Sequence, residues 1–162
     1  MEQEQDKIFY DLMKAYIAQM DSALKISNII YEHSDRDKGL SGDDIICGLI
    51  YRLMIPMTKE EIEESLGNAE TILGSEESDE SEESDESEEE QEEEKGEQED
   101  IVEQYKKSTI SRKIKSNQCN CEICSKVRVC LLNYKSFKPG DQLAQKFKDS
   151  IEHTCSEHKI YI

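Results

Sequence analysis

Residues 41–54 read SGDDIICGLIYRLM, and the apolar side chains of this stretch are the densest in the chain. Ser41 followed three residues later by Asp44 is typical of a capping box at a helix N-terminus. Pro56 ends the helix, because the residue before a proline disfavours helical backbone angles. A helix that is apolar around most of its circumference is usually buried, so we expect a central core helix with Cys47 as a small core residue. The alternative is an exposed docking surface for another chain.

Amphipathic helices are expected on both sides of this core helix. Between Asp6 and Tyr31, apolar residues recur at intervals of three and four, which predicts one long amphipathic helix. Thr58 and Glu61 repeat the capping-box spacing and predict a third, shorter helix. We therefore expect residues 1–73 to form a three-helix module.

A long acidic segment follows these helices. Residues 75–94 read SEESDESEESDESEEEQEEE, and residues 74–100 contain no aromatic or branched apolar side chain. Such a sequence cannot bury enough surface to offset the entropy of ordering it, so we predict that residues 74–104 form a disordered acidic linker. The formal net charge of −18 divides into −8 for residues 1–73, −16 for 74–100 and +6 for 101–162. The linker should therefore attract the basic C-terminal part or a basic external partner.

The serines of the acidic linker suggest phosphorylation. Acidophilic kinases of the casein-kinase type read an acid three residues after the target serine, and only Ser87 has one, in Glu90. A phosphate on Ser87 would supply the acidic group that Ser84 lacks, and the step could repeat toward the N-terminus. The alternative is a solvating spacer without modification. The five serines, spaced by three throughout, are Ser75, Ser78, Ser81, Ser84 and Ser87.

Residues 105–162 form a basic, cysteine-rich part with two expected helices. The first should run from about residue 122 to 135, and Asp141 is a good N-cap for the second. Packed as an antiparallel hairpin, these helices would bring the start of the first beside the end of the second. The expected fold class is therefore mainly α: an N-terminal helical module, an acidic linker and a C-terminal helical hairpin.

The hairpin would gather a set of metal ligands at its open end. Four such side chains suit the tetrahedral geometry of Zn2+, so we expect a structural zinc ion. One alternative leaves the cysteine cluster without a fourth ligand, and another assigns the CxxC pair to thiol redox chemistry. His33, among turn residues, is expected to be a solvated side chain. The expected ligands are Cys121, Cys124, Cys155 and His158, with Cys119 as the substitute.

A basic stretch precedes the cysteines and could contact nucleic-acid phosphates. Its only aromatic residue is Tyr105, so it lacks the stacking platform expected for single strands. The alternative is an exposed basic segment that folds back on the acidic linker. The candidate phosphate contacts are Lys106, Lys107, Arg112, Lys113 and Lys115.

The location of the protein is constrained by two features. No apolar N-terminal stretch follows a basic start as a secretory signal requires, and clustered cysteines then favour metal binding in a reducing compartment. The most apolar run contains Arg52 and is too short to span a bilayer. An intracellular protein without a membrane segment is expected.

Two stretches carry a family resemblance. They are CNCEICSKVRVCLLNYKSFKPGDQLAQKFKDSIEHTCSEHKIYI (residues 119–162) and SGDDIICGLIYRLMIPMTKEEIEESL (residues 41–66). Together they resemble uncharacterised proteins of large nucleocytoplasmic DNA viruses. The resemblance covers both helical parts but not the acidic linker. It implies a virus-encoded protein of the host cytoplasm or the virion, and it brings no catalytic residues.

The sequence therefore predicts a non-enzymatic interaction or scaffold protein whose acidic linker engages a basic protein partner. It contains no phosphate-binding glycine loop, serine nucleophile elbow, metalloprotease motif or dinucleotide fingerprint. The alternative is a zinc-stabilised nucleic-acid-binding module at residues 101–162 that the acidic linker inhibits. An enzyme that uses the cysteine cluster ranks last, because no base stands beside it in the sequence.

Overall fold

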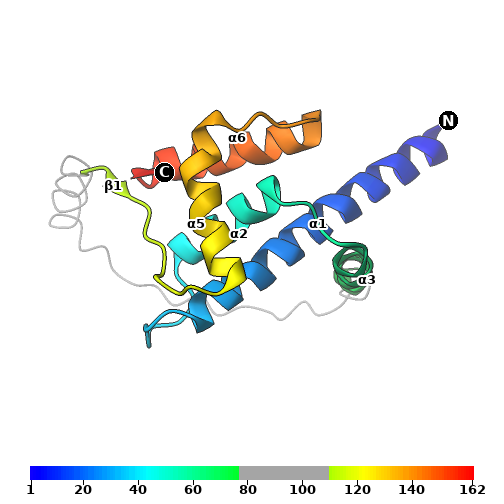
Figure 1. Ribbon diagram of the computed structural model, residues 1–162. Helices are drawn as coiled ribbons and strands as arrows, with labels where there is room; N and C mark the ends of the chain where they lie inside the picture. Colours follow the sequence, from blue (N-terminus) through cyan, green and yellow to red (C-terminus); the bar gives the residue numbers. More distant parts are fainter. Residues whose placement is uncertain (77–109) are drawn as a thin grey trace, which may run out of the picture.

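Five α-helices account for most of residues 1–76 and 110–162, the parts of the chain that this computed structural model describes (Figure 1). The remaining regular elements in these ranges are a short 3-10 turn, η1, and a two-stranded sheet. The expected mainly helical fold class is confirmed. The elements are α1 (Glu2–Glu32), α2 (Gly42–Met54), α3 (Lys59–Glu76), β1 (Arg112–Lys113), α5 (Glu122–Asn133), η1 (Tyr134–Ser136), α6 (Gln142–Glu157) and β2 (Ile160–Tyr161).

The helix starts follow the capping residues that the sequence indicates. Ser41 Oγ accepts a hydrogen bond from the Asp44 amide at 3.2 Å, and an Asp44 carboxylate oxygen accepts one from the Ser41 amide at 2.9 Å. Thr58 and Glu61 make the same reciprocal pair before α3, and Asp141 caps α6. Each cap satisfies backbone donors that have no partner within the helix. The predicted capping boxes are confirmed.

Helices α1 and α2 approach closely at Gly48. A Cβ atom built on Gly48 would lie 2.0 Å from Ser27 Oγ and 2.5 Å from the Ala23 carbonyl oxygen, so only glycine fits between the helices here. The neighbouring residues Cys47 and Ile50 are fully buried. The prediction that the apolar second helix is a core helix is therefore confirmed.

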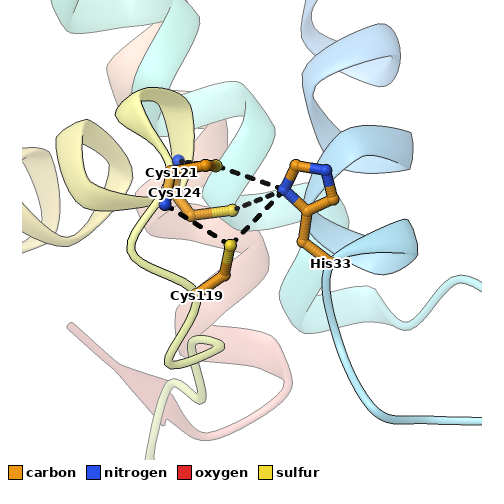
Figure 2. Close-up of side chains that lie close together, drawn as sticks. All are labelled: His33, Cys119, Cys121 and Cys124. Carbon is orange, nitrogen blue, oxygen red and sulfur yellow. Dashed lines mark hydrogen bonds between the residues drawn. The ribbon is translucent and has the colours of Figure 1, made fainter.

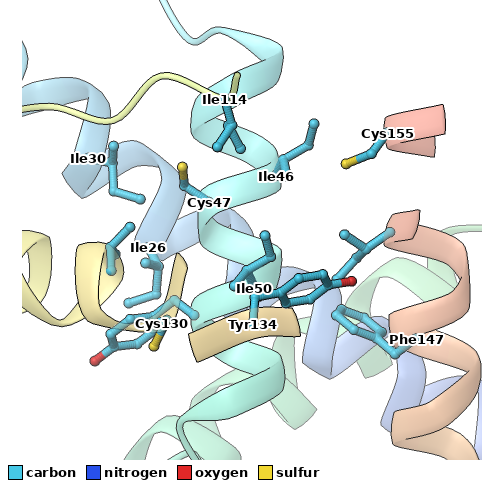
Figure 3. Close-up of a cluster of buried hydrophobic side chains, with 13 residues drawn as sticks. Ile26, Ile30, Ile46, Cys47, Ile50, Ile114, Cys130, Tyr134, Phe147 and Cys155 are labelled. Atoms are coloured by element: carbon cyan, nitrogen blue, oxygen red, sulfur yellow. The ribbon is translucent and has the colours of Figure 1, made fainter. Parts of the chain in front are cut away.

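One hydrophobic core joins the N-terminal helices to the C-terminal ones (Figure 3). Helices α5 and α6 each pack against α2, and α2 thereby has partners on several sides (Figure 1). The antiparallel hairpin expected for the C-terminal helices is wrong, because their apolar faces turn toward α2 and not toward each other. The buried core residues are Ile26, Ile30, Ile46, Cys47, Ile50, Tyr51, Ile114, Val127, Cys130, Tyr134, Phe147, Ile151 and Cys155.

The segment before α5 is held against α2 by the small sheet and by Asp43. Strands β1 and β2 pair in parallel, with the Arg112 amide donating to the Lys159 carbonyl oxygen at 2.9 Å. Asp43 accepts two hydrogen bonds from the Arg112 guanidinium, at 2.7 and 2.9 Å, and one from the Lys115 amide at 2.8 Å. These contacts fix the path of the chain toward the cysteines. Strands of two residues are too short to produce a recognisable alternation of apolar and polar side chains.

Several predictions concern residues outside the described ranges. The acidic linker beyond Glu76 lies there, as do Lys106 and Lys107. Ser75 belongs to the last turn of α3, one residue before its end. Among the helices of the described ranges, none combines the length and the apolarity that a membrane crossing requires. The serines that lie outside the described ranges are Ser78, Ser81, Ser84 and Ser87.

Candidate metal centre

The four residues of the candidate centre come from two segments that are distant in the sequence. His33 is the C-cap of α1, where its amide donates to the Ile29 carbonyl oxygen at 3.0 Å. Cys121 is the N-cap of α5 and Cys124 lies in the first turn of that helix. Cys119 precedes them in the segment that follows β1. The end of one helix therefore meets the beginning of another, and each carries side chains toward the same point (Figure 2).

The distances within this cluster match those between the ligands of a tetrahedral metal ion. His33 Nδ1 lies 3.2 Å from Cys121 Sγ and 3.6 Å from the Sγ atoms of Cys119 and Cys124. All four ligand atoms lie within 4.8 Å of one another. Zinc bonds of about 2.3 Å to sulfur and about 2.0 Å to nitrogen place tetrahedral N and S ligands about 3.5 Å apart.

Hydrogen bonding alone does not account for this convergence. A neutral imidazole nitrogen carries at most one proton, so Nδ1 cannot donate to three sulfur atoms at once. Figure 2 shows the three sulfur atoms gathered around that one nitrogen. The arrangement is typical of a Cys3His metal site, and the cluster could bind a metal such as zinc.

Backbone and side-chain N–H groups donate hydrogen bonds to the sulfur atoms of the cluster. The Cys121 amide donates to Cys119 Sγ at 3.4 Å, and the Cys124 amide donates to Cys121 Sγ at 3.4 Å. The hydrogen bond from the Cys124 backbone is the main cause that lowers the pKa of Cys121 to about 6. Burial raises the pKa of Cys124 to about 11. The pKa values of Cys121 and Cys124 therefore differ because Cys121 caps the N-terminus of α5, whereas Cys124 is buried.

Asn117 ties the cysteine segment to α1. Its side-chain nitrogen donates to the Ile30 carbonyl oxygen at 2.9 Å and to Cys124 Sγ at 3.2 Å. Its side-chain oxygen accepts from the Cys119 amide at 3.3 Å, and its own carbonyl accepts from Arg128 at 3.0 Å. Outer-shell partners of this kind orient metal ligands and hold them in place. The geometry of the cluster is thus supported by the fold around it.

The structure changes the set of ligands that the sequence suggests. It brings Cys121 and Cys124 together with the substitute Cys119, but Cys155 and His158 are not members of the group. Cys155 is a core residue with 5% of its surface exposed, and His158 is the C-cap of α6. The physical reason is the packing of α6 on α2, which takes its C-terminal end away from the start of α5. Figure 3 shows Cys155 in the core near Ile46.

His33 is the one candidate ligand of the cluster that was not predicted from the sequence. It was expected to be a solvated side chain, because nothing local distinguishes a histidine at the end of a helix. A signal was nevertheless present: the three cysteines of CNCEIC need a fourth ligand, and the chain has only three histidines. His33 lies 86 residues before Cys119, so local spacing could not identify it.

The basic segment before the cysteines is engaged by acidic side chains. Arg112 pairs with Asp43, and this guanidinium is the main cause that lowers the pKa of the Asp43 carboxyl. Arg36 pairs with Asp44 in the same way, at 2.5 and 2.6 Å. Both pairs line a cleft of about 820 Å³ that reaches His33 and Cys119. Among the expected phosphate contacts, Lys113 and Lys115 are exposed, whereas Arg112 already holds a carboxylate.

No protein-family model, curated protein sequence or solved structure matches this chain. Four protein ligands fill a tetrahedral coordination sphere and leave no position for substrate or water, as in structural zinc sites.

Proposed function

We propose that this chain is a zinc-stabilised, non-enzymatic interaction protein that holds its acidic segment ready for a basic protein partner. The observation that supports it most is the closed His33, Cys119, Cys121 and Cys124 cluster. A metal there would join the end of α1 to the start of α5. The site would then stabilise the fold and would not activate a substrate.

The position of the cluster explains why a metal would stabilise this fold. The cysteines lie 86 or more residues after His33, and the acidic segment lies in between. Closing so long a loop costs conformational entropy, and a metal clip offsets part of this cost. A small hydrophobic core buries little apolar area and is therefore only marginally stable. A metal site then contributes a large share of the stability of the fold.

The acidic segment joins two points of the same folded body. Helix α3 ends at Glu76 and β1 begins at Arg112, and these elements lie on opposite sides of α2 (Figure 1). The sequence between them carries most of the net charge of −18. A block of this charge attracts lysine- and arginine-rich segments over a range that salt controls. The helical body therefore serves as the anchor from which the acidic segment meets its partner.

Two features favour a protein partner over a nucleic acid. The Arg112 guanidinium is paired with Asp43, so it is not free for a phosphate. The acidic segment repels nucleic acid, whose phosphates carry the same sign of charge. We therefore propose a basic protein as the partner. Phosphorylation of the serines in the acidic segment would adjust the affinity for this partner.

The proposal is tested by exchanging the acidic segment within the full chain. The acids of residues 76–100 are replaced by Asn and Gln, which keeps the length, and a fluorescent lysine-rich peptide of about 15 residues is titrated onto both proteins. The native chain should bind the peptide, more weakly as salt rises, and the exchanged chain should lose at least tenfold in affinity. Equal binding by the two chains would overturn the proposal, as would tight, salt-dependent binding of a DNA duplex by the exchanged chain.

A further inference from the structure

The first half of α1 carries large apolar side chains that have no cover. Every residue from 1 to 13 is exposed, and in Figure 1 this part of α1 extends beyond the other labelled helices. Ile8, Phe9, Leu12 and Met13 have between 37% and 65% of their surface exposed. Steps of one, three and four residues place these four side chains on one face of the helix. In the described ranges, no element packs over them.

The same face of α1 is buried further along the helix. Tyr16 continues the stripe and meets Phe147 of α6 edge to face, with ring centroids 5.8 Å apart. Ala23, Ile26 and Ile30 continue it into the core against α2. The exposed stripe is therefore a direct extension of the surface on which the fold itself packs helices.

A groove adjoins the inner end of the stripe. It measures about 370 Å³ and lies where α1 passes α6, the end of α2 and α3. Its walls are mainly apolar and include Tyr16, Leu53, Leu66, Leu143 and Phe147. A helix laid along the stripe would reach this groove with one end. Exposed apolar surface that leads into a groove is typical of sites that receive an amphipathic helix.

The charges beside the stripe select the kind of helix that fits. At 100° per residue, Glu4 and Asp11 fall along one edge of the stripe and Glu2 and Asp6 along the other. The lysines of this part of α1 fall on the opposite side, where Lys14 pairs with Glu70 of α3. Both edges of the stripe are therefore acidic, so a partner with basic edges would gain favourable charge pairs.

We propose that the Ile8, Phe9, Leu12 and Met13 stripe is a docking site for an amphipathic helix of another protein, whose apolar face is flanked by lysine or arginine. A second copy of this chain fits less well, because acidic edges would then face acidic edges. An anionic membrane surface fits less well for the same reason. This site is distinct from the acidic segment between residues 76 and 110, and it selects shape as well as charge.

The test uses the full chain and three labelled peptides of about 18 residues, long enough to cover the stripe. The first has leucines at helical three- and four-residue spacing with lysines on both edges. The second has the same composition in scrambled order, and the third has glutamates in place of the lysines. We expect the first to bind at least tenfold more tightly than either of the others, because only it offers both an apolar face and basic edges.

Two sets of variants assign this binding to the stripe. Phe9→Asp and Leu12→Asp should each weaken binding of the first peptide at least tenfold. Gln3→Asp, which adds the same charge on the opposite side of α1, should leave binding within twofold. The double variant Glu4→Lys with Asp11→Lys should weaken binding of the first peptide and strengthen binding of the third. Because all these residues are exposed, the substitutions should leave the melting temperature unchanged. If one variant does melt at a lower temperature, Glu4→Lys with Asp11→Lys still tests the site, because unfolding would not strengthen binding of the third peptide.

Several outcomes would overturn the proposal. Equal binding of the first and scrambled peptides would assign the interaction to charge alone, and hence to the acidic segment. A native chain that forms dimers which Leu12→Asp dissociates would assign the stripe to a second copy. Binding to vesicles of anionic lipid that Phe9→Asp abolishes would assign it to a membrane surface. Binding of the first peptide that neither Phe9→Asp nor Leu12→Asp affects would place the site elsewhere.

Discussion

The thiol of Cys121 is more acidic than that of Cys124 because the start of α5 directs a backbone N–H donor at it. Its pKa of about 6 lies below its usual value, so it is a thiolate above pH 6 and becomes protonated below it. A ligand must lose its proton to bind a metal, so metal affinity should fall as the pH drops through this range. A metal bound by the cluster should therefore be held at neutral pH and released in acid.

This difference in acidity predicts the order of alkylation in metal-free protein. Iodoacetamide should modify Cys121 first, with a rate that rises around pH 6, because the thiolate is the reactive form. Cys124, with a pKa of about 11, should remain largely unmodified at pH 7. The buried Cys47, whose pKa burial raises to about 12, serves as the unreactive control. Mass spectrometry of peptides measures each site, and equal modification of all thiols near pH 8.5 would contradict this prediction.

At the scale of elements, local sequence predicted the helices well. Ser41, Thr58 and Asp141 marked helix starts correctly because a cap depends on a few neighbouring residues. The length of α1 and the burial of α2 followed from apolar periodicity. The partner of each apolar face did not follow, because a stripe indicates that a helix packs but not against which element. That is why α5 and α6 were expected to pair, whereas each packs against α2.

The close contact between α1 and α2 predicts opposite effects of two glycine substitutions. Gly48→Ala should lower the free energy of unfolding by about 2 to 3 kcal/mol, because the added Cβ would overlap Ser27 and the α1 backbone. Gly67→Ala, in α3, meets no atom within 4 Å and should raise it by about 0.5 to 1 kcal/mol through helix propensity. Urea denaturation measures both. A Gly48→Ala protein as stable as the native chain would show that α1 and α2 do not pack as described.

At the scale of the whole molecule, the core and the cluster both join segments that the acidic sequence separates. Cys121 and Cys124 could be recognised as candidate ligands from their spacing alone. His33 could not, because its place beside them depends on how α1, α2 and α5 pack together. Cys155 and His158 lie outside the cluster for the same reason, because the helix that carries them packs on α2. Long-range packing of the helices therefore decides which side chains form the cluster, and local sequence patterns do not contain this information.

This shared core predicts that the two halves complement each other. Fragments 1–76 and 110–162, expressed together, should copurify with about one zinc per pair, because α2 packs against both α5 and α6. Each fragment expressed alone should lack a cooperative thermal transition, since either one exposes half of the core. Two fragments that fold separately and do not associate would instead show two independent modules.

We expect His33 to complete a metal site together with the three cysteines. The most direct measurement is the zinc content per chain of three purified proteins: the native chain, His33→Ala and the matched control His158→Ala. We expect about one zinc in the native chain and in His158→Ala, and a large loss in His33→Ala, because only His33 lies among the thiols. Retention of zinc by His33→Ala together with its loss from His158→Ala would show that His158, and not His33, is the fourth ligand.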